Sequence, residues 1–318
     1  MNYKDIFLEV AKNNEQTFEG HRGIVSFSEM KQALIDRMLS NFALYRDDSI
    51  PVPEGYTYSV PWYPSDTPEQ FEKNLNSEDK LLLKKFGWVD NKGNPTPVSY
   101  NLNKYGYRCI DDLSKPGILF IGCSLTFCTG VNVEHSWPYL VAKHFDLEPY
   151  NFGRPAQGID GSCMMASLFL REELKNLKAI VVFLPPPGRH DYFIRSVQND
   201  LGISGTFMHL KKNDEYINTP METVESTRYE ELTPETILQH TWWSKENCVV
   251  SDFMNIGWLK QMAGELDIPL IVKDASKLYD TPVSDFNIQK FDNARDLMHY
   301  GPSINKYIAQ KIIMSLDI

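Results

Sequence analysis

The chain of 318 residues lacks the marks of several large protein classes. No stretch approaches the roughly 18 uncharged apolar residues of a membrane-spanning helix. Positive charge is scarce: 32 Lys and Arg face 42 Asp and Glu, so the net charge is −10. This balance disfavours binding to nucleic acid and to anionic lipid. The first apolar run is broken by charged residues, unlike a secretory signal. We therefore expect a cytoplasmic protein with neither nucleic-acid nor membrane partners.

Patterns that hold metals, cofactors or disulfides are also missing. The 5 cysteines are odd in number and form no Cys-x-x-Cys pair, which disfavours a disulfide scaffold and a structural zinc site. The 7 histidines form neither His-Glu-x-x-His nor His-x-His. No phosphate loop and no Gly-x-Gly-x-x-Gly follows an apolar run. The sequence thus predicts reduced thiols, no metal and no cofactor.

What is present divides the chain in two, and a chain of this length corresponds to one or two domains. Residues 1–115 predict an irregular, partly helical extension. It contains a helix near Ser28–Asn41, a segment rich in proline and aromatic residues at Ile50–Pro68, and a short helix near Ser77–Phe86. The prolines of the middle segment exclude a regular helix there. The aromatic side chains of this segment are expected to pack it onto the rest of the protein.

Residues 116–318 alternate apolar runs with helical patterns, the mark of an α/β domain. Apolar runs of this length are typical of parallel strands that are buried on both faces. The expected strands are Gly117–Gly122, Pro149–Phe152, Ala179–Leu184 and Pro269–Val272. The expected helices are Ser136–Phe145, Ser162–Leu177 and Asp252–Leu266. Residues near 195–250 interrupt this rhythm and predict an insertion at the edge of the sheet or over its top.

A serine follows the first of these strands. Ser124 lies just beyond Gly122, where a helix is expected to begin. Open α/β sheets bind their ligands at the carboxyl ends of the strands. Backbone N–H groups at such a turn can stabilise a developing oxyanion. The alternative is that Ser124 only caps the helix. Thr126 excludes the Gly-x-Ser-x-Gly elbow of α/β-hydrolases.

A carboxylate and an imidazole stand near the other end of the chain. Asp296 and His299 are followed by Gly-Pro and an amphipathic helix. At this spacing the carboxylate can orient the imidazole if the local turn is tight. The imidazole can then act as a general base for a distant serine. The alternative is a chance pair of surface residues.

Taken together, these pieces resemble the SGNH, or GDSL-type, hydrolase superfamily, in the same order from about residue 100 to residue 318. Gly122–Thr126 resembles its Gly-Asp-Ser-Leu-Thr block, with Cys123 in place of Asp. Tyr150–Gly158 resembles its second block, an Asn followed by a turn rich in glycine. Asp296 and His299 match its last block. The resemblance implies a three-layer α/β/α sandwich with a flavodoxin-like parallel sheet, and an esterase activity.

The resemblance also implies an oxyanion hole, and here the sequence departs from the family. The N–H of Ser124 is one expected donor. The second-block glycine aligns with either Ala156 or Gly158, and alanine still offers an N–H. His190 stands where the third block has an asparagine, and a neutral imidazole can also donate one hydrogen bond.

The resulting hypothesis is a serine esterase with the triad Ser124, His299 and Asp296. Its substrate is expected to be a small-molecule or glycan ester, such as an O-acetyl or short acyl group on a carbohydrate. The alternative is an inactive SGNH fold that serves as a structural or glycan-binding protein. Four aromatic residues of the insertion are candidates for shaping the pocket: Tyr216, Tyr229, Trp242 and Trp243. The sequence leaves the oligomeric state open.

Overall fold

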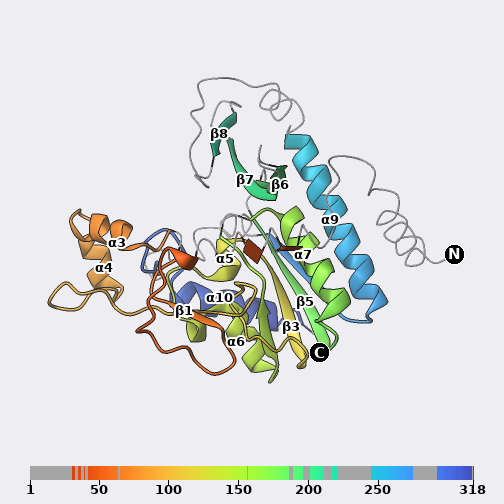
Figure 1. Ribbon diagram of the computed structural model, residues 1–318, viewed down its shortest axis with the longest axis horizontal. Coiled ribbons are helices and arrows are strands. Elements are labelled where there is room, and N and C mark those ends of the chain that lie inside the picture. The colour runs from red at the N-terminus through yellow and green to blue at the C-terminus, as the bar shows by residue number, and fades with distance from the viewer. Residues whose placement is uncertain are drawn as a thin grey trace.

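The core of the protein is a parallel sheet of four strands, β3 (Gly117–Gly122), β4 (Glu148–Asn151), β5 (Leu177–Leu184) and β9 (Leu270–Asp274). The strand order is β4-β3-β5-β9, and every neighbouring pair runs parallel (Figure 1). This computed structural model describes residues 31–32, 35–36, 39, 42–63, 65–155, 157–185, 189–195, 201–210, 216–220, 245–274, 292–316 and 318. The predicted α/β class and the parallel direction of the strands are confirmed.

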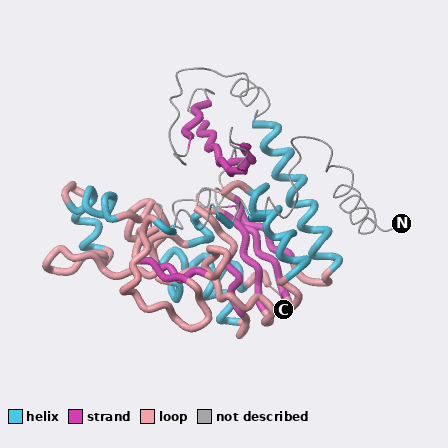
Figure 2. Tube along the Cα trace, viewed as in Figure 1, coloured by secondary structure: helices cyan, strands magenta, loops and turns pink. Residues whose placement is uncertain are grey.

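Helices cover both faces of this sheet, as Figures 1 and 2 show. The elements α6 (Trp137–His144) and α10 (Pro302–Ile313) cover one face, and α7 (Ile159–Glu172) and α9 (Lys245–Glu265) cover the other. Side chains of β3 alternate between the two cores. Phe120 packs with the first pair of helices, whereas Leu119 packs with the second. This period of two is what a strand buried on both faces requires.

The N-terminal extension carries more regular structure than its sequence suggested. The strand β1 (Tyr58–Val60) pairs antiparallel with β2 (Tyr100–Leu102). The short helix expected near Ser77–Phe86 is confirmed as α4 (Lys80–Lys85). A second helix, α3 (Pro68–Leu75), was not predicted. Its start is clear in retrospect, since the Thr67 side chain accepts a hydrogen bond from the N–H of Gln70 at 3.1 Å and proline occupies the first turn.

This extension packs onto the sheet and has no separate core within the described residues. Val60, Tyr63, Leu83 and Tyr100 are buried in the same apolar cluster as Phe120 of β3. The described helical residues between 31 and 43 agree with the helix expected near Ser28–Asn41. Most of the extension's buried residues therefore lie against the face of the sheet that α6 and α10 cover, whereas Tyr107, Cys109 and Leu113 pack with α7 and α9 on the other face.

A second sheet follows β5. Its three antiparallel strands are β6 (Arg189–Arg195), β7 (Leu201–Leu210) and β8 (Tyr216–Pro220), in the order β6-β7-β8. An insertion was expected near residues 195–250. The strands β7 and β8 lie in that range, and their partner β6 begins before it, at Arg189. The aromatic and apolar residues of β6 suit a strand, and the prolines after Leu184 end β5.

Two further features bear on the sequence expectations. The cysteines whose side chains the structure describes, Cys109, Cys123, Cys128 and Cys163, are all buried and free of disulfides. Within the described ranges, none of the helices has the length and apolar character needed to span a bilayer.

Candidate active site

Ser124 is the first residue of α5 (Ser124–Phe127), the short helix that follows β3. The preceding turn depends on Gly122, whose φ is 156°. A Cβ there would lie 2.3 Å from Thr126 Oγ1 and 2.5 Å from the carbonyl oxygen of Phe183. Only glycine fits this close approach, so the strand turns sharply and leaves Ser124 at the carboxyl edge of the sheet. The buried Cys123 caps no N–H with its side chain.

Ser124 is bonded through its backbone, and its side chain makes no hydrogen bond within the described part of the chain. Its carbonyl accepts from the N–H groups of Cys128, at 2.8 Å, and Thr129, at 3.3 Å. Cys128 ends α5 in the left-handed conformation, with φ 59°. Ser124 itself is 8% exposed. Its hydroxyl is therefore largely buried, and no described residue fixes its direction by a hydrogen bond.

Asn151 and Gly153, which belong to the second motif block, contact the backbone of α5. The side-chain amide of Asn151 donates to the carbonyl of Thr126 at 2.8 Å, and its oxygen accepts from the N–H of Gly153 at 3.0 Å. A Cβ on Gly153 would lie 2.4 Å from the backbone nitrogen of Phe127. From its sequence, this block was expected to supply an oxyanion donor. In the structure its Asn151 bonds to the helix that Ser124 begins.

The structure brings Asp296 and His299 together. His299 Nδ1 lies 2.5 Å from Asp296 Oδ2. The other carboxylate oxygen accepts from the N–H groups of Met298 and His299, each at 3.0 Å. Leu297 between them adopts φ 59°, which makes the turn tight enough for this contact. The Asp296 side chain is fully buried and that of His299 is 14% exposed, so the ring reaches the surface while its orienting carboxylate does not.

The loop of Asp296 and the chain that follows α5 lie side by side. The N–H of Arg295 donates to the carbonyl of Gly130 at 3.1 Å, and a Cβ on Gly130 would lie 2.7 Å from Ala294 Cβ. Cys128 Sγ lies 3.2 Å from Asn305 Oδ1 of α10. The chain at Gly130, just beyond α5, thus adjoins the loop from Asn293 to His299, which we call the histidine loop. No hydrogen bond joins Ser124 to the His299 ring, both of which are described.

Residues of the N-terminal extension hold the histidine loop, and the sequence analysis did not assign them to the site. Ser65 Oγ donates to Asp296 Oδ2 at 3.2 Å, and the side-chain amide of Asn74 donates to the carbonyl of Asp296 at 3.3 Å. Trp88 Nε1 donates to the carbonyl of Asn293 at 2.7 Å. No motif in the extension signals these contacts, because each joins residues more than 200 positions apart.

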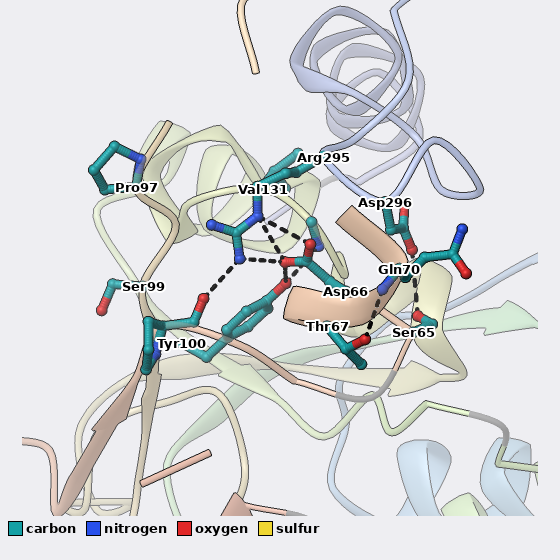
Figure 3. A network of polar contacts seen from close by, with 12 residues as sticks. Ser65, Asp66, Thr67, Gln70, Pro97, Ser99, Tyr100, Val131, Arg295 and Asp296 are labelled. Carbon is teal, nitrogen blue, oxygen red and sulfur yellow. Dashed lines mark hydrogen bonds and ion pairs between the residues drawn. The ribbon is translucent and has the colours of Figure 1, made fainter. Parts of the chain in front are cut away.

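A buried ion pair lies next to these contacts, as Figure 3 shows. Arg295 Nη2 lies 2.7 Å from Asp66 Oδ2 and its Nε lies 2.9 Å from Oδ1, with both side chains almost fully buried. Tyr100 also donates to this carboxylate. Burial raises the pKa of Asp66, although the bonds from Arg295 and Tyr100 oppose the shift. Burial and the Asp66 charge hold the pKa of Tyr100 well above its usual value, so this phenol stays a hydrogen-bond donor.

The other expected oxyanion donors are less completely described. Gly158 caps α7 with an ordinary φ of −79°, and Ala156 lies outside the described residues. His190 lies in β6, where its backbone pairs with Thr206, so it belongs to a strand of the second sheet and not to a loop at the sheet edge. Gln157, which lies between Ala156 and Gly158, is fully buried. Its side-chain amide makes no hydrogen bond to any described residue.

The insertion aromatics were proposed to shape the pocket. Tyr216 is the first residue of β8, and Tyr229, Trp242 and Trp243 lie outside the described residues, so this role stays a prediction.

In the described ranges, no three His, Cys, Asp or Glu side chains gather to hold a metal ion.

Comparison with known proteins adds no relative. No family model matches the chain, and no curated sequence is similar to it. The geometry of the site therefore carries the functional argument.

Proposed function

We propose that the protein is a serine esterase of the SGNH, or GDSL, type. The observation that carries the proposal is the contact between Asp296 and His299, in a loop that bonds to the chain at Gly130, shortly after the serine helix α5. A buried carboxylate on Nδ1 fixes the tautomer and leaves Nε2 to accept a proton. The strand order β4-β3-β5-β9 supports the proposal, because it follows the flavodoxin-like order of a three-layer sandwich.

In the proposed reaction, Ser124 Oγ attacks the acyl carbon of an ester while its proton passes to His299 Nε2. The imidazolium is stabilised by Asp296 and returns the proton to the alkoxide as the ester C–O bond breaks. A water molecule then hydrolyses the acyl-enzyme by the same route, and Ser124 is regenerated. The N–H of Ser124 at the start of α5, with the N–H of Ala156 or Gly158, stabilises the oxyanion. An acetyl or short acyl group on a carbohydrate is the proposed substrate class.

The reaction requires Ser124 and His299 to approach each other more closely than in this structure. Catalytic hydrogen bonds are often long without substrate and tighten in the complex. The hydroxyl of Ser124 has no competing partner among the described residues, so no hydrogen bond of the hydroxyl to them has to break before it can bond to His299.

A second candidate is an inactive SGNH fold that binds glycans or serves a structural role. Two observations favour it. Ser124 and His299 share no hydrogen bond, and His190 belongs to a strand where the family has its third-block asparagine. Under this alternative the residues of the site are retained without turnover.

Labelling with a fluorophosphonate separates the two functions, together with a screen of acetyl and short-chain acyl esters. The esterase predicts labelling and turnover in the native protein and neither in Ser124→Ala. Ser167→Ala is the matched control, since among the described residues Ser167 Oγ bonds to carbonyls of its own helix, α7, at 2.8 and 2.9 Å. Absence of labelling in the native protein, with the fold intact by circular dichroism, would favour the inactive fold.

A further inference from the structure

Ser65 is the residue outside the histidine loop that bonds to the Asp296 carboxylate. Oδ1 of Asp296 is occupied by N–H groups of its own loop, and Oδ2 receives both His299 Nδ1 and Ser65 Oγ. The hydroxyl and the imidazole therefore bond to the same oxygen. A donor in this place fixes the direction of the carboxylate and shares its charge with the imidazole.

The backbone of Ser65 is held in a conformation that serine rarely adopts. Its φ is 74°, in the left-handed region that favours glycine. The residue lies in a turn closed by two hydrogen bonds between Tyr63 and Asp66, at 2.9 and 3.1 Å. A side chain kept at a strained position is a sign that the side chain itself is used.

The buried ion pair explains how the strain is sustained. Asp66 follows Ser65 in the chain and Arg295 precedes Asp296, so the bond between Asp66 and Arg295 joins the neighbours of the two residues. Arg295 also donates to the carbonyl of Pro61 at 2.6 Å, before the same turn. Figure 3 shows Ser65 and Asp296 directed at each other beside this ion pair. The ion pair therefore holds the Ser65 hydroxyl against the carboxylate.

We propose that Ser65 is a positioning residue for the Asp296–His299 pair, supplied by the N-terminal extension. This inference rests on the proposed esterase function. It makes the extension part of the active site and gives the turn at Ser65 a role beyond packing. The hydroxyl does not touch the substrate. It acts by keeping Asp296 Oδ2 directed at His299 Nδ1.

Two substitutions separate the hydroxyl from the backbone strain. Ser65→Gly removes the hydroxyl and relieves the strain, whereas Ser65→Ala removes the hydroxyl and keeps the strain. We expect both to lower kcat by about 10- to 100-fold with KM nearly unchanged, the size expected for one lost hydrogen bond to a charged group. Ser65→Gly should melt no lower than the native protein. Ser65→Asn tolerates the left-handed backbone and restores a donor, so it should recover part of the activity.

Thr67→Ala is the matched structural control in the same segment. It removes the N-cap of α3, whose bond to the N–H of Gln70 is 3.1 Å, and should lower the melting temperature while kcat is retained. The positioning role is overturned if kcat simply follows the melting temperature across these variants. Ser65→Gly would then keep both the native melting temperature and the native kcat.

A proton NMR measurement tests the positioning role without relying on esterase activity. The proton between His299 Nδ1 and Asp296 Oδ2 should give a low-field ¹H resonance that is absent in His299→Ala. We expect this resonance to move in both Ser65→Gly and Ser65→Ala and to stay in place in Thr67→Ala. An unmoved resonance in Ser65→Gly overturns the proposal whether or not the protein hydrolyses esters. If Ser124 proves unreactive, a moved resonance still supports the positioning role.

Discussion

The two halves of the candidate site are built in different ways. The elements of the serine turn, β3, Gly122 and α5, follow one another in the chain, and side chains from elsewhere, such as Asn151 and Arg108, donate to carbonyls of α5 and its C-cap. The histidine loop is held by residues far from it in the sequence, because Ser65, Asn74 and Trp88 all bond to it.

Both halves touch the N-terminal extension, but through different residues. Arg108 donates to the carbonyls of Phe127 and Cys128 at 3.0 and 2.7 Å and so supports the end of α5, whereas Ser65, Asn74 and Trp88 bond to the histidine loop. A loop that depends on distant partners is correct only when the extension is docked. The comparison predicts that substitutions at Ser65, Asn74 or Trp88 act on the His299 loop and leave the Ser124 turn in place, because none of their hydrogen bonds given above reaches α5.

The largest expected effect comes from joining the two halves. Ser124→Ala and His299→Ala should each lower kcat by about 10⁴-fold or more, and the double variant should be hardly worse, because members of a triad act as a unit. Measured kcat values for the two single variants and the double variant test this. If the two losses multiply, the halves do not share a mechanism.

The second largest effect is expected from a substitution of the ion pair that anchors the histidine loop. Asp66→Asn should lower the free energy of unfolding by about 3–5 kcal/mol, because it leaves the Arg295 charge buried and unpaired. Urea unfolding measures this loss. Arg46→Ala is the control: it removes an ion pair with Asp48 whose side chains are 60% and 80% exposed, and should leave stability nearly unchanged. Equal losses in both variants would show that the buried pair does not anchor the loop.

A smaller effect is expected from a substitution beside the serine helix α5. Gly153→Ala places a Cβ against the backbone of Phe127 and should destabilise the protein by about 1–3 kcal/mol by overpacking. It should also displace α5 and reduce labelling of Ser124, while the low-field proton of His299 stays. Gly257→Ala in α9 meets nothing within 4 Å and should stabilise by roughly 0.5–1 kcal/mol. Movement of the His299 proton in Gly153→Ala would show that the halves are not independent.

The sequence predicted the local half of the site better than the distant half, for a physical reason. Apolar runs and their spacing reveal strands buried on both faces, so all four parallel strands were found, with ends shifted by a few residues. The serine turn follows from the same pattern. Asp296 and His299 were found because three positions separate them. Ser65, Asn74 and Asp66 left no such signal, since their partners are set by tertiary packing of a segment without periodicity.

The same reasoning explains why the strand β6 was not predicted. The third block of the family places a loop after the third strand, and His190 was read in that light. Strand propensity in Arg189–Arg195 instead continues the chain into an antiparallel pair with β7. A resemblance across a short motif therefore singled out Ser124, Asp296 and His299 for the proposed triad but gave no sign of β6.

The smallest expected effect is a pH dependence at the end of the serine helix. Burial raises the pKa of Cys128 to about 12, whereas an unfolded thiol titrates near about 8.5. The folded state therefore favours the neutral thiol, and the resulting stability is fully present below about pH 8.5 and is lost as pH rises toward 12. At pH 9.5 this one group should account for a loss of about 1.4 kcal/mol relative to neutral pH. Cys128→Ser keeps a donor for Asn305 Oδ1 and does not titrate in this range, so its stability should fall by that much less between pH 7.5 and 9.5. Urea midpoints across this range measure the difference, and parallel curves for the two proteins would show that the thiol is not buried as described.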